Sequence, residues 1–227
     1  GASRGIGKAI CERFAKEGID IVFNYSNDVN GANDTVALCE KYGVKAYAIK
    51  ANVSDSAECA DFIKKALELL GGRIDILVNN AGFGTYGTFE ETPVEKEIEM
   101  IELNCSSLTG ICGYAISYMK KDSILINTAS LASFMPLGNF AVYAATKSYV
   151  LSFSIALAAE LKHKGIKVCA LCPGPVSTEF ANVASNGARE KVKHGLPADK
   201  VVKHCLKKAY KGKRIILYAL KWKFAAT

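Results

Sequence analysis

Tyr143 and Lys147 stand four residues apart in a stretch of helix-forming residues. Side chains at positions i and i+4 of a helix share one face, so both can reach one bound molecule. A phenol with an ordinary pKa near ~10 is a poor base at neutral pH, and a neighbouring ammonium favours its ionised form. The pair could therefore move a proton to or from the oxygen of a carbonyl or an alcohol. An exposed pair on a helix has the same spacing, so the motif needs support from its surroundings.

A glycine cluster at the start of the chain is the second chemical feature. Gly1, Gly5 and Gly7 lead directly into a helical stretch. Glycine allows tight turns and a close approach of the backbone to a ligand. The N-terminus of the following helix presents unpaired N–H groups and a positive dipole end, which together favour phosphate. The G-x-x-x-G-x-G spacing differs from the commoner G-x-G-x-x-G, and three glycines alone would equally suit a plain turn.

The elements that must position these residues alternate along the whole chain. Aliphatic and β-branched runs predict strands at 19–25, 44–52, 74–79, 123–128, 166–171 and 214–218. Helices are predicted at 5–17, 29–42, 56–70, 93–118, 143–163 and 198–210. Strands separated by helices pair in parallel through right-handed crossovers. The sequence therefore predicts one α/β domain over 1–227, a doubly wound Rossmann-like parallel sheet that binds ligands beyond the carboxyl ends of its strands.

Composition narrows the class of protein. The chain has 227 residues, half of them apolar, which suits one ordinary globular domain. No apolar run approaches the ~20 residues of a membrane span and no signal-peptide pattern begins the chain, so we expect a soluble cytoplasmic protein without a transmembrane segment. Eight cysteines are too sparse for a disulfide scaffold. Cys169 and Cys172 lie in the apolar run 168–172, which is typical of a buried strand, and no second such pair occurs, so we expect buried thiols and no metal site.

Charge is unevenly distributed along the chain. The net charge is +7, yet the stretch 189–223 alone holds twelve Lys or Arg residues and only two acidic ones. Such a region could favour an anionic substrate, an acidic carrier protein or a membrane surface. A solvated helical face of lysines would give the same pattern. No motif of a nucleic-acid-binding module is present, so we expect no nucleic-acid partner.

Taken with three further motifs, the glycine spacing resembles the short-chain dehydrogenase/reductase family. The family's glycine motif is T-G-x-x-x-G-x-G; its N-N-A-G occurs here at 79–82, its Y-x-x-x-K at 143–147 and its P-G-x-x-x-T at 173–178. The resemblance implies hydride transfer between a nicotinamide cofactor and a ketone or secondary alcohol. The family's first strand, which lies mid-sheet between 19–25 and 74–79, precedes Gly1. A sheet without it would leave unpaired backbone groups, so we expect that strand in the natural chain.

The resemblance also implies a set of catalytic residues. Tyr143 would transfer the proton, and Lys147 would lower its pKa and bind the nicotinamide ribose. Ser130 lies thirteen residues before Tyr143, the spacing of the family's ketoreductases, and would orient the substrate oxygen. Thr128 and Ser133 are neighbouring hydroxyls without that spacing. Asn104 matches the family's asparagine that holds a water relaying protons to the lysine.

Cofactor contacts follow from the same motifs. No acidic residue ends the second strand before Asp28, and Arg4 could pair with a 2′-phosphate, so NADP is predicted in preference to NAD. The implied cofactor-binding residues are Gly1, Ser3, Arg4, Gly5, Ile6, Gly7, Asn24, Ser26, Asn52, Val53, Asn79, Ala81, Gly82, Tyr143, Lys147, Pro173, Gly174, Val176 and Thr178.

The substrate is expected to be apolar. A lid is predicted at about 179–196, with other walls at 83–89 and 131–140. The apolar residues of these segments, some of which helix packing alone would explain, are Phe83, Phe134, Met135, Leu137, Phe140 and Phe180. Three hypotheses remain open: an NADP-dependent reductase of a steroid-like or fatty-acyl-like ketone, a ketoacyl reductase acting on an acidic carrier protein, and a non-catalytic dinucleotide sensor. The family resemblance also implies that the helices at 93–118 and 143–163 pair between copies, which would give a homodimer or homotetramer.

Overall fold

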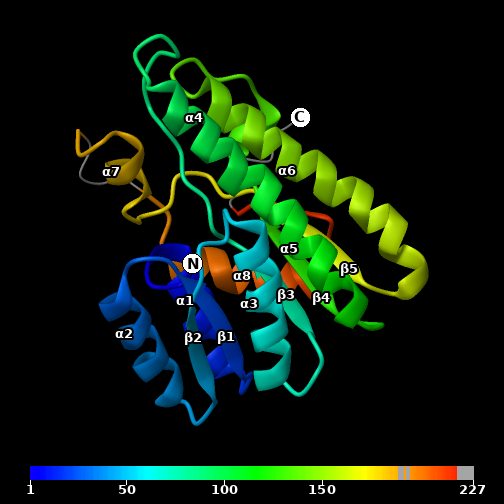
Figure 1. The fold of residues 1–227 in the computed structure, drawn as a ribbon. Helices are drawn as coiled ribbons and strands as arrows, with labels where there is room; N and C mark the ends of the chain where they lie inside the picture. Colours follow the sequence, from blue (N-terminus) through cyan, green and yellow to red (C-terminus); the bar gives the residue numbers. More distant parts are fainter. Residues whose placement is uncertain (189–191, 193–194, 219–227) are drawn as a thin grey trace.

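A computed structural model describes residues 1–188, 192 and 195–218, and it has the alternating parallel architecture that the sequence predicts (Figure 1). Its strands are β1 (Ile21–Tyr25), β2 (Ala46–Lys50), β3 (Ile76–Asn79), β4 (Ile124–Thr128), β5 (Lys167–Leu171) and β6 (Ile215–Ile216). Its helices are α1 (Gly5–Lys16), α2 (Val29–Glu40), α3 (Ser56–Leu69), α4 (Val94–Ile101), α5 (Leu108–Ala115), α6 (Ala141–Glu160), α7 (Phe180–Ala184) and α8 (Ala198–Ala209).

All strand pairs are parallel and are covered by helices on both faces. β1 pairs with β2, and the other strands follow the order β3-β4-β5-β6. In β4, Leu125 belongs to the hydrophobic cluster that includes residues of α3, α5 and α6, whereas Ile126 belongs to the cluster that includes residues of α1, α2 and α8. This alternation buries β4 on both sides, which explains its continuous apolar sequence.

β1 and β3 are not hydrogen-bonded to each other in the described part of the chain. Direct pairing between them would have contradicted the expected additional strand at this position in the sheet. The strand itself therefore stays a prediction. The predicted lid at 179–196 is described only in part, because 189–191 and 193–194 lie outside the described residues.

The predicted helix at 93–118 is the clearest departure from expectation. It is divided into α4, a π-helical segment at Glu102–Ser107, α5 and a 3-10 turn at Ile116–Tyr118. The Ser107 hydroxyl donates to the carbonyl of Glu102 at 2.9 Å, five residues earlier. Helix periodicity in a sequence cannot show such a widened turn, and π segments often occur at functional sites.

A network of buried amides joins the sheet to α6. Asn79 Nδ2 donates to Asn127 Oδ1 at 2.9 Å, and Asn127 Nδ2 donates to Ser154 Oγ at 3.0 Å. All three side chains are buried, so their mutual hydrogen bonds remove the cost of desolvating them. The network keeps the carboxyl ends of β3 and β4 in a set position against α6.

By length and composition, the helical run Ala141–Lys164 could cross a membrane. In this structure, however, α6 packs against β4 and β5, and Val150, Leu151 and Leu157 belong to the hydrophobic core. Core helices of globular proteins commonly meet the same measure. The cytoplasmic location expected from the sequence stays a prediction.

Candidate active site

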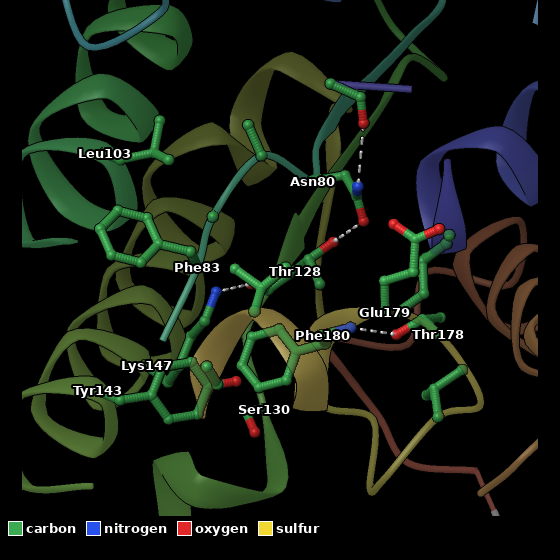
Figure 2. Close-up of a pocket in the computed structure, with 18 of the residues that line it drawn as sticks. Asn80, Phe83, Leu103, Thr128, Ser130, Tyr143, Lys147, Thr178, Glu179 and Phe180 are labelled. Atoms are coloured by element: carbon green, nitrogen blue, oxygen red, sulfur yellow. Dashed lines mark hydrogen bonds between the residues drawn. The ribbon is translucent and has the colours of Figure 1, made fainter. Parts of the chain in front are cut away.

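A cleft of about 1040 Å³ runs along the carboxyl ends of the strands (Figure 2). Most of the sequence-predicted residues line it: Gly1, Ser3, Arg4, Gly5, Ile6, Asn24, Ser26, Asn52, Val53, Ala81, Gly82, Ser130, Tyr143, Lys147, Pro173, Gly174, Val176 and Thr178. Gly7, Asn79 and Asn104 lie behind this lining. The cleft therefore brings together side chains and loops that are far apart in the sequence.

Tyr143 lies in the first turn of α6, with its side chain in the cleft beside Ser130 (Figure 2). Burial raises the pKa of the phenol to about 12, and a hydrogen bond with the Ser130 side chain partly offsets this rise. The phenol is therefore protonated at neutral pH. It can donate a proton to an oxygen atom placed between it and Ser130.

The three hydroxyls near Tyr143 have different roles. Ser133 Oγ donates to the carbonyl of Lys147 at 2.7 Å, which fastens the 3-10 turn Leu131–Phe134 to α6. Thr128 Oγ1 contacts Asn80 Oδ1 at 3.4 Å. Ser130 Oγ accepts a hydrogen bond from the amide of Ala132 at 3.1 Å, and it also lies beside the Tyr143 phenol. Of the three, only Ser130 is placed to share a substrate oxygen with Tyr143.

The ammonium of Lys147 lies beneath Tyr143 and is almost completely buried. Its Nζ donates to the carbonyl of Thr128 at 2.9 Å and lies 5.9 Å from the centre of the Tyr143 ring. Burial lowers the pKa of Lys147 to about 8. A lysine with this pKa is still mostly charged at neutral pH, so it favours the phenolate that Tyr143 would form after losing its proton.

Asn104 lies in the π-helical segment, where it holds the chain that follows β3. Its Nδ2 donates to the carbonyl of Phe83 at 2.9 Å and to Thr146 Oγ1 at 3.0 Å, and its Oδ1 accepts from the amide of Phe83 at 3.1 Å. An asparagine side chain can make four hydrogen bonds, so one acceptor position remains for a water. The water relay implied by the family resemblance stays a prediction.

Two glycines are required by close packing. A Cβ on Gly82 would lie 2.7 Å from Asn104 Oδ1 and 3.3 Å from Lys147 Nζ. A Cβ on Gly7 would overlap with the carbonyl of Gly1, so α1 could not begin directly against the glycine loop. Both positions therefore exclude larger residues for geometric reasons.

The glycine-loop end of the cleft suits a dinucleotide phosphate. The loop precedes α1, whose first N–H groups have no side-chain cap. Arg4 pairs with Glu179 at 2.8 Å, and both side chains are exposed. Asn24 Nδ2 donates to the carbonyl of Ala51 at 3.2 Å and joins the ends of β1 and β2. The ion pair of Arg4 with the lid residue Glu179 was not foreseen from the sequence.

The opposite end of the cleft is aromatic. Ring centres are 5.0 Å apart for Tyr86 and Phe140, 5.6 Å for Phe140 and Tyr143, and 5.4 Å for Tyr143 and Phe180. Lining residues that the sequence analysis did not single out include Tyr86, Leu103, Val183 and Ala184. Tyr86 lies within the predicted wall at 83–89, so the segment was identified but the residue was not.

Phe134 corrects one expectation about the pocket. Phe83, Met135, Leu137, Phe140 and Phe180 line the cleft, but Phe134 does not. It packs against the core instead, because the 3-10 turn Leu131–Phe134 directs it there. The expected substrate walls therefore lose one aromatic residue.

The cysteines take no part in the site. All eight are free and buried, and burial raises the pKa of the Cys172 thiol to about 12. In the described part of the chain, no three His, Cys, Asp or Glu side chains gather as metal ligands would.

A family model described as short chain dehydrogenase matches residues 1–188. The chain belongs to this family. It is 34% identical over 200 residues to 3beta-hydroxysteroid dehydrogenase 1 of Eggerthella lenta, covering 85% of this chain and 76% of that protein. It is 36% identical over 185 residues to 3-oxoacyl-[acyl-carrier-protein] reductase of Synechocystis sp., covering 79% of this chain and 73% of the other.

Solved structures agree with the assignment to the short-chain dehydrogenases. A short chain dehydrogenase from Burkholderia cenocepacia in complex with NADP superposes with a TM-score of 0.85 at 27% identity, covering 96% of this chain and 93% of that one. The predicted family and parallel α/β fold are thus confirmed. As a member of this family, the chain is an oxidoreductase that acts on CH–OH groups.

The buried charge of Lys147 gives a prediction about stability. Replacing Lys147→Met removes an ammonium whose pKa is lowered from 10.5 to about 8, so the free energy of unfolding at pH 7 should rise by roughly 1–3 kcal/mol. The burial cost is complete below pH 8 and disappears as pH approaches 10.5, because the folded lysine loses its proton first. Denaturant unfolding should therefore show the advantage of the variant narrowing between these values.

Lys203→Met is the matched control, since Lys203 is exposed on α8. The difference in the free energy of unfolding between Lys203→Met and the parent should stay constant over the same pH range. A Lys147→Met protein that is less stable at pH 7, or whose advantage is independent of pH, would contradict the assigned cost.

Proposed function

We propose that this chain reduces an apolar ketone to a secondary alcohol, with hydride from NADPH and a proton from Tyr143. The observation that carries the proposal is that the phenol of Tyr143 and the hydroxyl of Ser130 lie beside each other in the cleft (Figure 2), next to the buried ammonium of Lys147. When bound, NADPH supplies the hydride at C4 of its nicotinamide. The protein's residues supply orientation and the proton.

The proton transfer has a direct physical basis. Ser130 holds the ketone oxygen beside the phenol, and Tyr143 donates its proton as negative charge develops on that oxygen. A pKa of about 12 keeps the phenol protonated at neutral pH, as the reductive direction requires. Lys147 then stabilises the phenolate, because its ammonium lies close beneath the ring. Asn104 supports the arrangement by holding Phe83 and Thr146.

The preference for NADP is supported by charge. Ser26, which follows β1, lines the cleft where an acidic residue would bind the ribose of NAD. Arg4 is exposed, and its pairing with Glu179 is solvent-accessible and hence weak, so a 2′-phosphate can take the place of the carboxylate. The similar Burkholderia cenocepacia structure is described in complex with NADP.

An apolar substrate is supported by the residues that line the aromatic end of the cleft, opposite the glycine loop. Phe83, Met135, Leu137, Phe140 and Phe180 surround the space next to Tyr143. Burying a flat or extended hydrocarbon against such side chains is favourable at roughly 25 cal/mol per Å². The relatives named for 3beta-hydroxysteroids and 3-oxoacyl groups suit steroid-like and fatty-acyl-like ketones alike.

A ketoacyl group on an acidic carrier protein is the second candidate substrate. Lys200, Lys203 and Lys207 are exposed on α8, and one similar protein is a 3-oxoacyl-[acyl-carrier-protein] reductase. Turnover restricted to carrier-linked substrate and weakened by salt would favour it. A non-catalytic dinucleotide sensor is disfavoured, because sensing requires neither a proton donor paired with Ser130 nor a costly buried ammonium.

Tyr143→Phe tests the mechanism. Loss of the proton donor should lower kcat for NADPH-dependent ketone reduction by about 10³-fold, the middle of the range for general acid catalysis. The Kd for NADPH, measured by its fluorescence, should stay the same, because the ring itself remains. Tyr42→Phe serves as the control, because Tyr42 is exposed and does not line the cleft. Full activity in the Tyr143→Phe protein would refute the assignment.

Arg4→Gln tests the cofactor preference. If Arg4 binds the 2′-phosphate, its loss should raise the KM for NADPH by about tenfold or more and leave the KM for NADH nearly unchanged. Arg73→Gln is the matched control, since Arg73 forms a comparably exposed ion pair with Asp75 at 3.0 Å. Equal effects of Arg4→Gln on the two cofactors would remove Arg4 from this role.

Assembly into a homodimer or homotetramer is proposed from exposed apolar side chains on adjacent helices. Val94, Ile98 and Ile101 of α4 and Tyr149 of α6 are each more than 40% exposed, and α4 packs against α6. Sedimentation should show a dimer or tetramer for the parent and a smaller species for Ile98→Asp. Leu69→Asp on α3 should leave the mass unchanged. A monomeric parent would end the proposal.

A further inference from the structure

The segment 83–87 connects three walls of the cleft. Asn104 holds both backbone groups of Phe83. The amide of Tyr86 donates to the carbonyl of Ala184 in the lid helix α7 at 2.7 Å. The amide of Gly87 donates to the carbonyl of Asn139 at 3.1 Å, in the loop before α6. The lid and this loop are therefore both attached to one short strip of backbone.

The same strip passes directly over the reacting phenol. A Cβ on Gly84 would lie 2.9 Å from Tyr143 Cδ2 and 2.9 Å from Phe180 Cζ. Phe83 and Tyr86, on either side, line the cleft. A shift of the strip by a fraction of an ångström would consequently change the space between Tyr143 and the lid.

Glu97 on α4 is an unusual anchor for this strip. Its side chain is only 6% exposed, and its Oε1 accepts a hydrogen bond from Thr85 Oγ1 at 2.8 Å. Its Oε2 is buried without a hydrogen-bond partner among the described residues. Burying a carboxylate with so little compensation costs more than an apolar residue would cost at this position. Stability therefore does not account for Glu97, whereas a fixed position for Thr85 does.

Glu97 and Asn104 work from the same side of one helical run. Glu97 lies in α4 and Asn104 in the π-helical segment that follows, and both side chains contact the segment 83–87. Asn104 forms hydrogen bonds with the segment at Phe83, and Glu97 forms one with it at Thr85, two residues later. Gly84 lies between these two points, which explains how its backbone is held against the Tyr143 ring.

We propose that Glu97 is a positioning residue that determines which ketones fit the cleft. Its hydrogen bond with Thr85 sets the position of the backbone segment 83–87 relative to the Tyr143 ring. That segment in turn sets the distance of α7 and the 131–140 loop from Tyr143. The inference rests on the proposed function and adds to it the structural element that controls substrate size.

Thr85→Val tests this role, because valine keeps the shape of threonine and removes the donor to Glu97. The KM for a bulky apolar ketone should rise by about tenfold, while kcat and the Kd for NADPH change by less than about twofold. Thr85→Ser keeps the hydroxyl donor, and Glu97→Gln keeps an acceptor oxygen. Each of these two single variants should therefore have a KM near that of the parent. An unchanged KM in Thr85→Val, or an equal loss of NADPH binding, would overturn the proposal.

Hydrogen exchange followed by mass spectrometry gives a readout that does not depend on turnover. In Thr85→Val, the amides of Tyr86 and Gly87 should exchange at least about fivefold faster, while those of α1 and β4 keep the parent rate. Unchanged protection of Tyr86 and Gly87 would contradict the role of Glu97. If the parent reduces none of the ketones tested, the proposed function fails, and the exchange experiment still decides whether Glu97 holds the strip.

Discussion

The buried ammonium of Lys147, bound to the carbonyl of Thr128, is the contact around which the site is organised. Thr128 is the last residue of β4, so this single hydrogen bond fastens α6 to the carboxyl end of a central strand. Ser130 follows two residues later, and Tyr143 lies one turn before Lys147 on the same helix. The hydrogen bonds among Asn79, Asn127 and Ser154 also hold β4 against β3 and α6. The distances between these side chains are thus set by the sheet and by α6.

This arrangement is costly for the folded state. Lys147 keeps a charge out of water, and Glu97 keeps a carboxylate in the interior with one hydrogen bond. Apolar residues would pack at both positions with less desolvation. Departures of this kind from the most stable choice are expected where a protein performs chemistry, because reactivity requires polar groups that are held away from solvent.

The two ends of the cleft use different physical means. The glycine-loop end consists of backbone N–H groups, a helix terminus and the exposed Arg4, which together suit any dinucleotide of the right charge. The aromatic end consists of side chains supplied by loops and by the first turns of α6 and α7, and its dimensions depend on how the loops are attached to α4, α6 and α7. Members of one family can therefore share the first end and differ in the second.

The sequence by itself determined the alternation of strands and helices, since apolar periodicity and chain punctuation are local. It also predicted Tyr143, Lys147, Ser130 and the glycine loop as site residues, because their spacing is local or matches a family pattern, and these residues line one cleft in the structure. Only the tertiary structure decided the π-helical turn that carries Asn104, the inward packing of Phe134 and the burial of Glu97. It likewise decided that Arg4 meets Glu179, a residue far from it in the sequence. Each of these features depends on a partner supplied by a different element of the fold, and no local pattern encodes which partner that will be.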